Sequence, residues 1–283
     1  MICPKGCGKM LVGERLLVCG WCGEALSRDL HLPEPLPEMV QVPAGVFLMG
    51  SPENAPIALE HEKPRRKIYL SSYSISRHPV TNGSYREFVK DSRRNTPAHW
   101  EKRPPLGANA KHPVCFVNWE DALAYCAWLS KITGAHYTLP TEAQWEKAAR
   151  GGFWLDGDDD AGVRNEEPGR IYPHGNTPFE ASYGNFAGLE GGTTIVGSFP
   201  KGASPYGCLD MAGNVSEWCL DTYNPTALNK LDDRNPLFHG NGIKVLKGGS
   251  WRSEAAHVRC ANRYFYDAAR TSYGIGFRVV RTE

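Results

Sequence analysis

The stretch YTLPTEAQWEKAARGG, residues 137–152, carries boundary signals at both ends of a short helix. Thr141 is followed three residues later by Gln144, which is the spacing of a capping box at a helix N-terminus. Gly151 and Gly152 come directly after the last helix-forming residue, where glycine commonly ends a helix. We therefore predict a helix from about residue 142 to residue 150.

A second helix is predicted just upstream, within PVCFVNWEDALAYCAWLSKITG at residues 113–134. Asn118 is a good N-cap, Glu120 and Asp121 place negative charge in the first turn, and Gly134 ends the helix. The residues expected on its apolar face are Ala122, Tyr125, Cys126 and Leu129.

The remaining elements are predicted to be short. Strands are expected within 39–51 and 67–81, the second leading into a helix NGSYREFVKDS capped by Thr81 or Asn82. Residues 152–245 are expected to be mostly loop, with a short strand at 194–199. Strands at 243–251 and 275–281 should flank an irregular, aromatic-rich segment. With 30 glycines and 21 prolines, the chain is predicted to be a loop-rich α+β protein.

Composition narrows the class of protein. The 283 residues include 32 basic and 31 acidic side chains, so the net charge of +1 favours neither a nucleic-acid nor a membrane binder. No signal peptide and no transmembrane stretch are visible, so a cytoplasmic location is expected. In the cytoplasm, an odd number of scattered cysteines favours reduced, buried thiols. These cysteines are Cys115, Cys126, Cys208, Cys219 and Cys260.

Four further cysteines lie close to the N-terminus: Cys3, Cys7, Cys19 and Cys22. Two pairs flank a segment, KMLVGERLLV, that could form a β-hairpin. Four thiolates in a tetrahedron suit a structural Zn²⁺. We predict a zinc ribbon at residues 1–26, followed by a proline-rich linker at 27–38; an unstructured tail with free thiols and a rubredoxin-like iron site are the alternatives.

The order of several phrases along the chain points to a family. VPAGVFLMGS, YSISRHPVTNGSYREFV, PVCFVNWEDALAYCAWL, YTLPTEAQWEKAARGG, ASYGNFAG, DMAGNVSEW, VLKGGSW, RCANR and GFRVV occur in sequence. Together they resemble the formylglycine-generating-enzyme and sulfatase-modifying-factor family. The resemblance implies a C-type-lectin-like fold of the formylglycine-generating-enzyme subtype over residues 39–283.

The resemblance also implies where an active site would lie. In the catalytic members, two cysteines just after the GGS[WY] strand bind Cu(I). Here the first position is Ser253, the second falls near His257, and Cys260 matches a structural position. A hydroxyl cannot replace a thiolate on Cu(I), so the chain is not expected to be an enzyme. The alternative is a metal-dependent oxidase that acts on a thiol through other ligands.

Calcium is a separate expectation from the resemblance. Family enzymes bind Ca²⁺ through two asparagine motifs, which Asn185, Asn214 and Glu217 match in this sequence. Amide and carboxylate oxygens are the ligands that Ca²⁺ prefers. The alternative is that Asn214 and Glu217 only hydrogen bond a buried loop.

Residues 252–274 are predicted to be a ligand-binding face, because this stretch lines the ligand face in C-type-lectin folds. Tyrosine and arginine beside small residues also resemble an antibody paratope. We expect an exposed patch of Tyr264, Phe265, Tyr266 and Tyr273. The candidate binding residues are Trp251, Arg252, Ser253, Ala255, Ala256, His257, Tyr264, Phe265, Tyr266, Ala268, Ala269, Thr271, Ser272 and Tyr273.

One subset of the family comprises the variable proteins of diversity-generating retroelements, in which adenine-directed mutagenesis rewrites codons ahead of a fixed GFR end. Such codons cannot yield Lys, Gln, Met, Trp or Glu, and residues 252–274 contain only one of these, Glu254. VRCANR would be the scaffold between varied blocks. We thus expect a non-catalytic protein that binds a protein or other macromolecule, either as a retroelement variable protein or as an invariant binding member.

Overall fold

The computed structural model describes residues 10–13, 16–19, 36–157, 162–230 and 232–282. The chain divides into two compact units, residues 1–34 and 35–283. In the first, β1 (Met10–Gly13) and β2 (Leu16–Cys19) pair as an antiparallel hairpin, in the segment where one was predicted.

Most of the predicted zinc ligands lie outside the residues that the structure describes. Cys3, Cys7 and Cys22 lie outside the described residues, and Cys19 is the last residue of β2. The zinc ribbon therefore stays a prediction.

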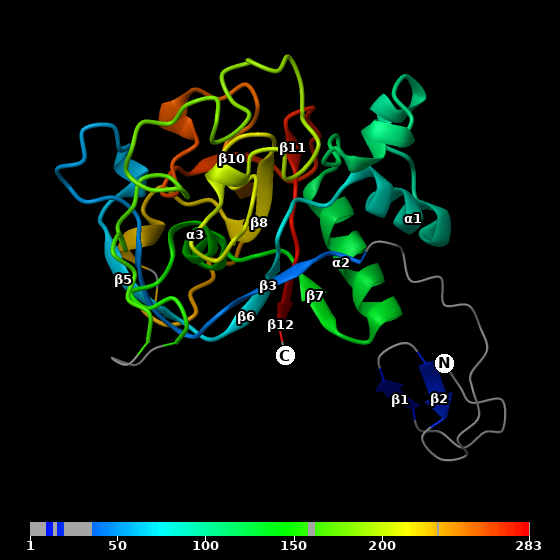
Figure 1. Cartoon of the computed structure of the whole chain (residues 1–283), viewed down its shortest axis with the longest axis horizontal. Coiled ribbons are helices and arrows are strands. Elements are labelled where there is room, and N and C mark those ends of the chain that lie inside the picture. Colours follow the sequence, from blue (N-terminus) through cyan, green and yellow to red (C-terminus); the bar gives the residue numbers. More distant parts are fainter. Residues whose placement is uncertain (1–9, 14–15, 20–35, 158–161, 231, 283) are drawn as a thin grey trace. The chain divides into compact units, whose positions relative to one another are not determined.

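The second unit contains two four-stranded sheets and a two-stranded one (Figure 1). The first sheet has the order β3-β6-β12-β7, so the first and the last strands of the unit belong to one sheet. The second has the order β10-β9-β8-β11, in which only the β8–β11 pair is parallel. The strands are β3 (Met39–Val42), β4 (Gly45–Met49), β5 (Arg66–Leu70), β6 (Tyr73–Ser76), β7 (His136–Thr138), β8 (Ser216–Thr222), β9 (Ile243–Lys247), β10 (Tyr264–Asp267), β11 (Ile275–Gly276) and β12 (Val280–Thr282).

Three α-helices begin and end close to where the sequence places them. They are α1 (Asn82–Ser92), α2 (Trp119–Thr133) and α3 (Glu142–Arg150). Thr81, rather than Asn82, caps α1, and the predicted capping signals of α2 and α3 are confirmed. Short 3-10 helices add η1 (Glu60–Glu62), η2 (Ala98–Glu101), η3 (Gly107–Lys111), η4 (Pro200–Gly202), η5 (Ala227–Asn229) and η6 (Ala255–His257).

The predicted strand at 194–199 is wrong. Gly197 adopts φ +77°, and its N–H donates to the side chain of Asp210 at 2.7 Å. The N–H of Val196 donates to the carbonyl of Lys111. Because these backbone groups bond to scattered partners rather than to one neighbouring strand, the segment forms turns.

Three other strand predictions need correction, because 39–51, 67–81 and 275–281 each form two strands; 67–81 forms β5 and β6. The stretch 39–51 forms two strands, β3 and β4, which belong to different sheets. Likewise 275–281 divides into β11 and β12. β8 and β10 were not predicted as strands, because β8 buries the polar residues Ser216, Glu217 and Asp221 instead of alternating.

The core is rich in aromatic side chains. One buried cluster surrounds Trp145 of α3 and includes Phe47 of β4. A second joins Tyr85 of α1 and Tyr125 of α2 to Phe277, as the abundance of aromatic residues suggests. No helix in the described part of the chain is long and apolar enough to span a bilayer.

Candidate ligand-binding site

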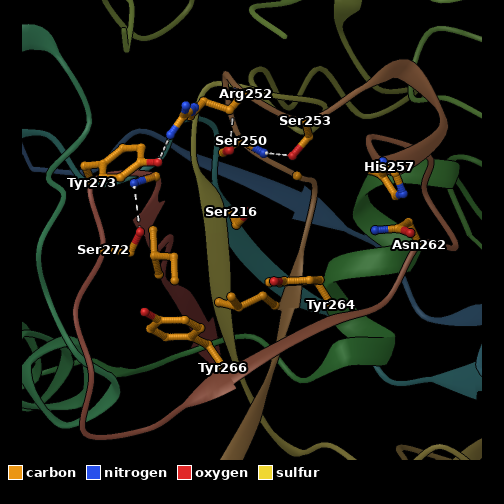
Figure 2. Close-up of a pocket in the computed structure, with 14 residues that line it drawn as sticks. Ser216, Ser250, Arg252, Ser253, His257, Asn262, Tyr264, Tyr266, Ser272 and Tyr273 are labelled. Atoms are coloured by element: carbon orange, nitrogen blue, oxygen red, sulfur yellow. Dashed lines mark hydrogen bonds between the residues drawn. The ribbon is translucent and has the colours of Figure 1, made fainter. Parts of the chain in front are cut away.

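A cavity of about 410 Å³ lies over β8, β9 and β10. Its rim comes from the two connections that flank β10 in the sequence, and its polar side chains converge around Ser216 (Figure 2). It is lined by Ser216, Leu246, Gly249, Ser250, Arg252, Ser253, His257, Asn262, Tyr264, Tyr266, Ser272, Tyr273, Gly274 and Ile275.

Strand β10 provides two tyrosines of the wall. Because side chains alternate between the two faces of a strand, Tyr264 and Tyr266 share a face, and both line the cavity. Phe265 does not line the cavity, and its ring centroid is 4.2 Å from that of Tyr223. The Phe265 ring also stacks on that of Tyr264, with centroids 5.7 Å apart, so these two members of the expected aromatic patch are neighbours. Tyr264, Phe265 and Tyr273 are 55%, 39% and 43% exposed, whereas Tyr266 is half-buried.

The turn after β9 places the serines of the rim. Gly249 has φ +65°, and a Cβ there would lie 2.9 Å from the carbonyl oxygen of His257, so only glycine fits this turn. The Ser253 hydroxyl accepts a hydrogen bond of 2.9 Å from the N–H of Ser250. The Ser253 hydroxyl thus holds the turn.

Arg252 lies between two aromatic rings at the rim. Its guanidinium carbon is 5.5 Å from the Trp251 ring centroid and 5.3 Å from that of Tyr273. It also donates a hydrogen bond to the Tyr273 hydroxyl. Tyr273 lines the first cavity and, together with Trp251, a second cavity of about 310 Å³. Tyr273 therefore borders both cavities, whereas Trp251 lines only the second.

Residues 258–263 form a buried support between the exposed parts of this face. Arg259 donates to both carboxylate oxygens of Glu62 at 2.6 and 2.8 Å. Arg263 does the same to Glu142, at 2.6 and 2.9 Å. These bidentate pairs anchor the segment at two points of the core. Arg259 and Arg263 are thereby structural residues.

The predicted binding residues lie in several places. Ala255 packs against an apolar cluster with Tyr172 and Phe179, and Phe265 does not line the cavity. Ala256, Ala268, Ala269 and Thr271 line neither of the two cavities described here. Those that line the first cavity are Arg252, Ser253, His257, Tyr264, Tyr266, Ser272 and Tyr273, and Trp251 lines the second.

Sequence reasoning missed part of the cavity wall. Ser216 comes from the start of β8, and Leu246 from β9, so only strand pairing brings them to residues 252–274. Asn262 was assigned to the scaffold, and it is buried, yet it lines the cavity. Its Oδ1 has no hydrogen-bond partner among the described residues, so it offers an acceptor to a ligand. In the sequence, the only signal for Asn262 was its polar amide within residues 258–263, a stretch that the structure shows to be buried.

The thiols of this unit are all buried and form no disulfide. Burial raises the pKa of the Cys115 thiol to about 12 and that of Cys260 to about 11. Both are therefore protonated at neutral pH, whereas a metal ligand must be a thiolate. In the described ranges, no three His, Cys, Asp or Glu side chains gather as a metal-binding group.

Two of the three predicted calcium ligands, Asn214 and Glu217, accept hydrogen bonds within the protein. Both carboxylate oxygens of Glu217 accept from the Arg278 guanidinium, at 2.5 and 2.8 Å, and one also accepts from the Trp145 indole. The Asn214 Oδ1 accepts the N–H of Thr194. Of the three predicted calcium ligands, Asn185 is the one whose side-chain oxygen is buried without a partner among the described residues. Glu217 thus holds the core together and leaves no carboxylate oxygen without a partner; calcium binding stays a prediction.

Comparison with known proteins places the chain in a family. The sulfatase-modifying factor enzyme 1-like domain family, also called FGE-sulfatase, matches residues 28–283. The chain belongs to the FGE-sulfatase family. Its mixed helices and sheets are the fold of that family, as the sequence motifs indicated.

FGE-sulfatase relatives include both active and inactive proteins. The formylglycine-generating enzyme of Thermomonospora curvata is 31% identical, over 87% of this chain and 93% of the enzyme. The mouse inactive C-alpha-formylglycine-generating enzyme 2 is also 31% identical, over 86% of this chain and 85% of that protein. Membership in the family therefore does not decide whether this chain is catalytic.

A third relative is much longer than this chain. Serine/threonine-protein kinase pkn1 of Chlamydia caviae is 32% identical over 88% of this chain, but only 39% of the kinase is matched. The chain thus spans about two-fifths of the length of that relative.

Solved structures show the same FGE-sulfatase fold. PvdO from Pseudomonas aeruginosa matches with a TM-score of 0.69 and 27% identity, over 87% of this chain and 95% of PvdO. Treponema denticola variable protein 1 matches with a TM-score of 0.64 and 24% identity, over 87% of this chain and 95% of that protein.

Proposed function

We propose that this FGE-sulfatase domain is a non-catalytic recognition protein that binds a protein or other macromolecule through the first cavity and its rim. The observation that carries the proposal is the construction of that cavity. Exposed tyrosine and arginine side chains and half-buried serines surround it, while the segment between them is anchored by buried ion pairs. Rigid aromatic side chains offer contact area at low entropic cost, and serines add adaptable hydrogen bonds.

Variation of this surface is the second part of the proposal. Residues 252–274 contain almost only residue types that adenine-directed mutagenesis can produce, and the exposed positions alternate with a buried block at 258–263. The test is genomic. A near-repeat of the 3′ end of the gene, differing at adenines and adjacent to a reverse transcriptase, is expected. If both are missing, the domain is an invariant binding protein.

The exposed positions should tolerate substitution, whereas the support should not. We expect Tyr264→Ser and Thr271→Ala to change the free energy of unfolding by no more than about 0.5 kcal/mol, because both side chains are exposed. Arg259→Met leaves the Glu62 carboxylate buried without its partner and should cost about 3–5 kcal/mol. Urea denaturation monitored by tryptophan fluorescence measures each value. Equal losses at exposed and buried positions would contradict a scaffold with a variable surface.

The alternative is a metal-dependent thiol oxidase, which the relationship to formylglycine-generating enzymes favours. After anaerobic incubation with Cu(I) or Fe(II) and desalting, we expect neither metal to be retained stoichiometrically. Oxygen uptake with a cysteine-containing peptide should match the protein-free rate, because the five thiols described in the second unit are buried and burial raises their pKa, to about 12 for Cys115 and about 11 for Cys260. The Thermomonospora curvata enzyme serves as the positive control. One retained copper with thiol-dependent oxygen uptake would establish the oxidase.

The same metal analysis also tests the proposed zinc ribbon and the proposed calcium site. We expect one zinc per chain as purified, lost when Cys19 and Cys22 are replaced by serine, because four thiolates suit Zn²⁺. Calcium retained by the chain would require a ligand set that does not depend on Glu217. Zinc that remains after both cysteines are replaced would contradict the ribbon.

A further inference from the structure

The second cavity, of about 310 Å³, is built from parts of the chain that the first cavity does not use. Its wall includes η2 and the residues after it, the segment at 113–116, and the Gly-Gly-Thr turn at 191–193. Only Tyr273 lines both cavities. The volume is at the lower end of the range for small-molecule sites.

The charge of this cavity is positive. Lys102 and Arg103 line it and are exposed, and neither forms an ion pair or a side-chain hydrogen bond in the described structure. No aspartate or glutamate is among the lining residues. His99 adds no charge, because burial and then the charge of Arg103 lower its pKa. Two unpaired cations without a neighbouring carboxylate favour an anion.

The other walls are aromatic. The Phe116 ring stacks on His99 with centroids 5.0 Å apart, and Trp251 and Tyr273 add two more rings. Phe116 has φ +57°, a conformation that costs energy for a bulky residue and that clusters at binding sites. Its N–H donates to the carbonyl of Ser272, which fixes the ring at this position.

Polar groups without partners complete the cavity. The His99 Nδ1 is buried and makes no hydrogen bond among the described residues. The N–H groups of Gly192 and Thr193 are likewise not donated to any group of the described chain. A ligand in this cavity therefore meets donors as well as cations and aromatic faces.

From these features, we propose that the second cavity binds a small aromatic anion, a single ring that carries a carboxylate or phosphate group. The ring would stack among Phe116, Trp251 and Tyr273, and the anionic group would lie against Lys102 and Arg103. This site does not depend on the proposed function of the first cavity, because it shares only Tyr273 with it.

Isothermal titration of the full chain tests the site with four probes: phenyl phosphate, benzoate, inorganic phosphate and phenol. Either aromatic anion should bind at least tenfold more tightly than inorganic phosphate or phenol. The double variant Lys102→Gln/Arg103→Gln should weaken that binding at least tenfold. The matched control Lys131→Gln/Arg281→Gln removes two exposed cations outside the cavity and should leave the dissociation constant unchanged.

The comparison of phenyl phosphate with benzoate identifies which anionic group is preferred. The proposal is overturned if neither aromatic anion binds more tightly than inorganic phosphate. It is also overturned if the Lys102→Gln/Arg103→Gln protein binds as the wild type does, or if the control pair weakens binding equally. None of these results depends on a macromolecular ligand of the first cavity.

Discussion

Replacement of Glu217 by glutamine is expected to lower the free energy of unfolding by about 3–5 kcal/mol. The Glu217 carboxylate and the Arg278 guanidinium are both fully buried, and two hydrogen bonds join them. The amide of glutamine leaves the guanidinium charge without a counter-charge in the core. Urea denaturation at pH 7 measures the loss.

The effect of calcium on this loss of stability distinguishes the two roles considered for Glu217, a structural partner of Arg278 and a calcium ligand. If its role is structural, the loss should be the same in excess calcium and in EDTA, because no ion takes part. The matched control is Glu166→Gln, which changes an exposed carboxylate and should have an effect within about 0.5 kcal/mol. A loss that occurs only in calcium would show instead that Glu217 acts through the ion.

A loss of similar size, about 3–5 kcal/mol, is expected for Glu142→Gln at pH 7. Glu142 joins α3 to the support of the binding face, because Arg263 binds both of its oxygens and Lys247 lies 3.8 Å away. The double variant Glu142→Gln/Arg263→Met removes both charges and should recover much of the stability. If the double variant is less stable than either single one, the loss comes from packing and not from an unpaired charge.

Acid should destabilise the protein through the same carboxylate. Burial alone would raise the pKa of Glu142, but the charges of Arg263 and Lys247 hold it below its ordinary value. Since the folded pKa is depressed, this stability is present above the unfolded pKa of about 4.3 and is lost as the pH falls through the folded pKa. Unfolding free energies measured from pH 5 to pH 3 should therefore fall less steeply in Glu142→Gln.

Asp221 makes the free energy of unfolding depend on pH in the opposite sense to Glu142, and it does so over a different pH range. Burial, and then the charge of Glu142, raise the pKa of Asp221 to about 7. Between the unfolded pKa of about 3.9 and this value, the folded chain binds more protons than the unfolded chain, so stability decreases as the pH rises. The pH range of the Glu142 effect lies below about pH 4 and that of the Asp221 effect lies above it. The contributions of the two carboxyl groups to the free energy of unfolding can therefore be measured separately.

The sequence alone predicted the three α-helices and their ends correctly. The ends of α2 and α3 depend on capping residues within a few positions of each helix, such as Asn118 and Thr141. These signals act between neighbours in the chain and need no tertiary contact. The ordered family motifs likewise indicated the domain. They also indicated the segment 252–274, from which nine residues of the first cavity come.

Tertiary structure decided everything that depends on distant partners. β8 is a strand because its buried polar residues find partners elsewhere, such as Arg278 for Glu217, 61 residues away. The same pairing gave Glu217 a structural role where the motif indicated calcium. Ser216 joins the cavity because β8 pairs with β9 and β11, and its own partner is Ile275, another residue of the cavity wall.

Strand alternation placed Tyr264 and Tyr266, but not Phe265, in the wall of the first cavity. The basic second cavity combines residues near 100, 115, 192 and 251, which no local pattern connects. The physical reason is the range of the interactions: caps and turns are set by neighbouring residues. Ion pairs, cavities and the faces of strands are set by which distant segments the core brings together.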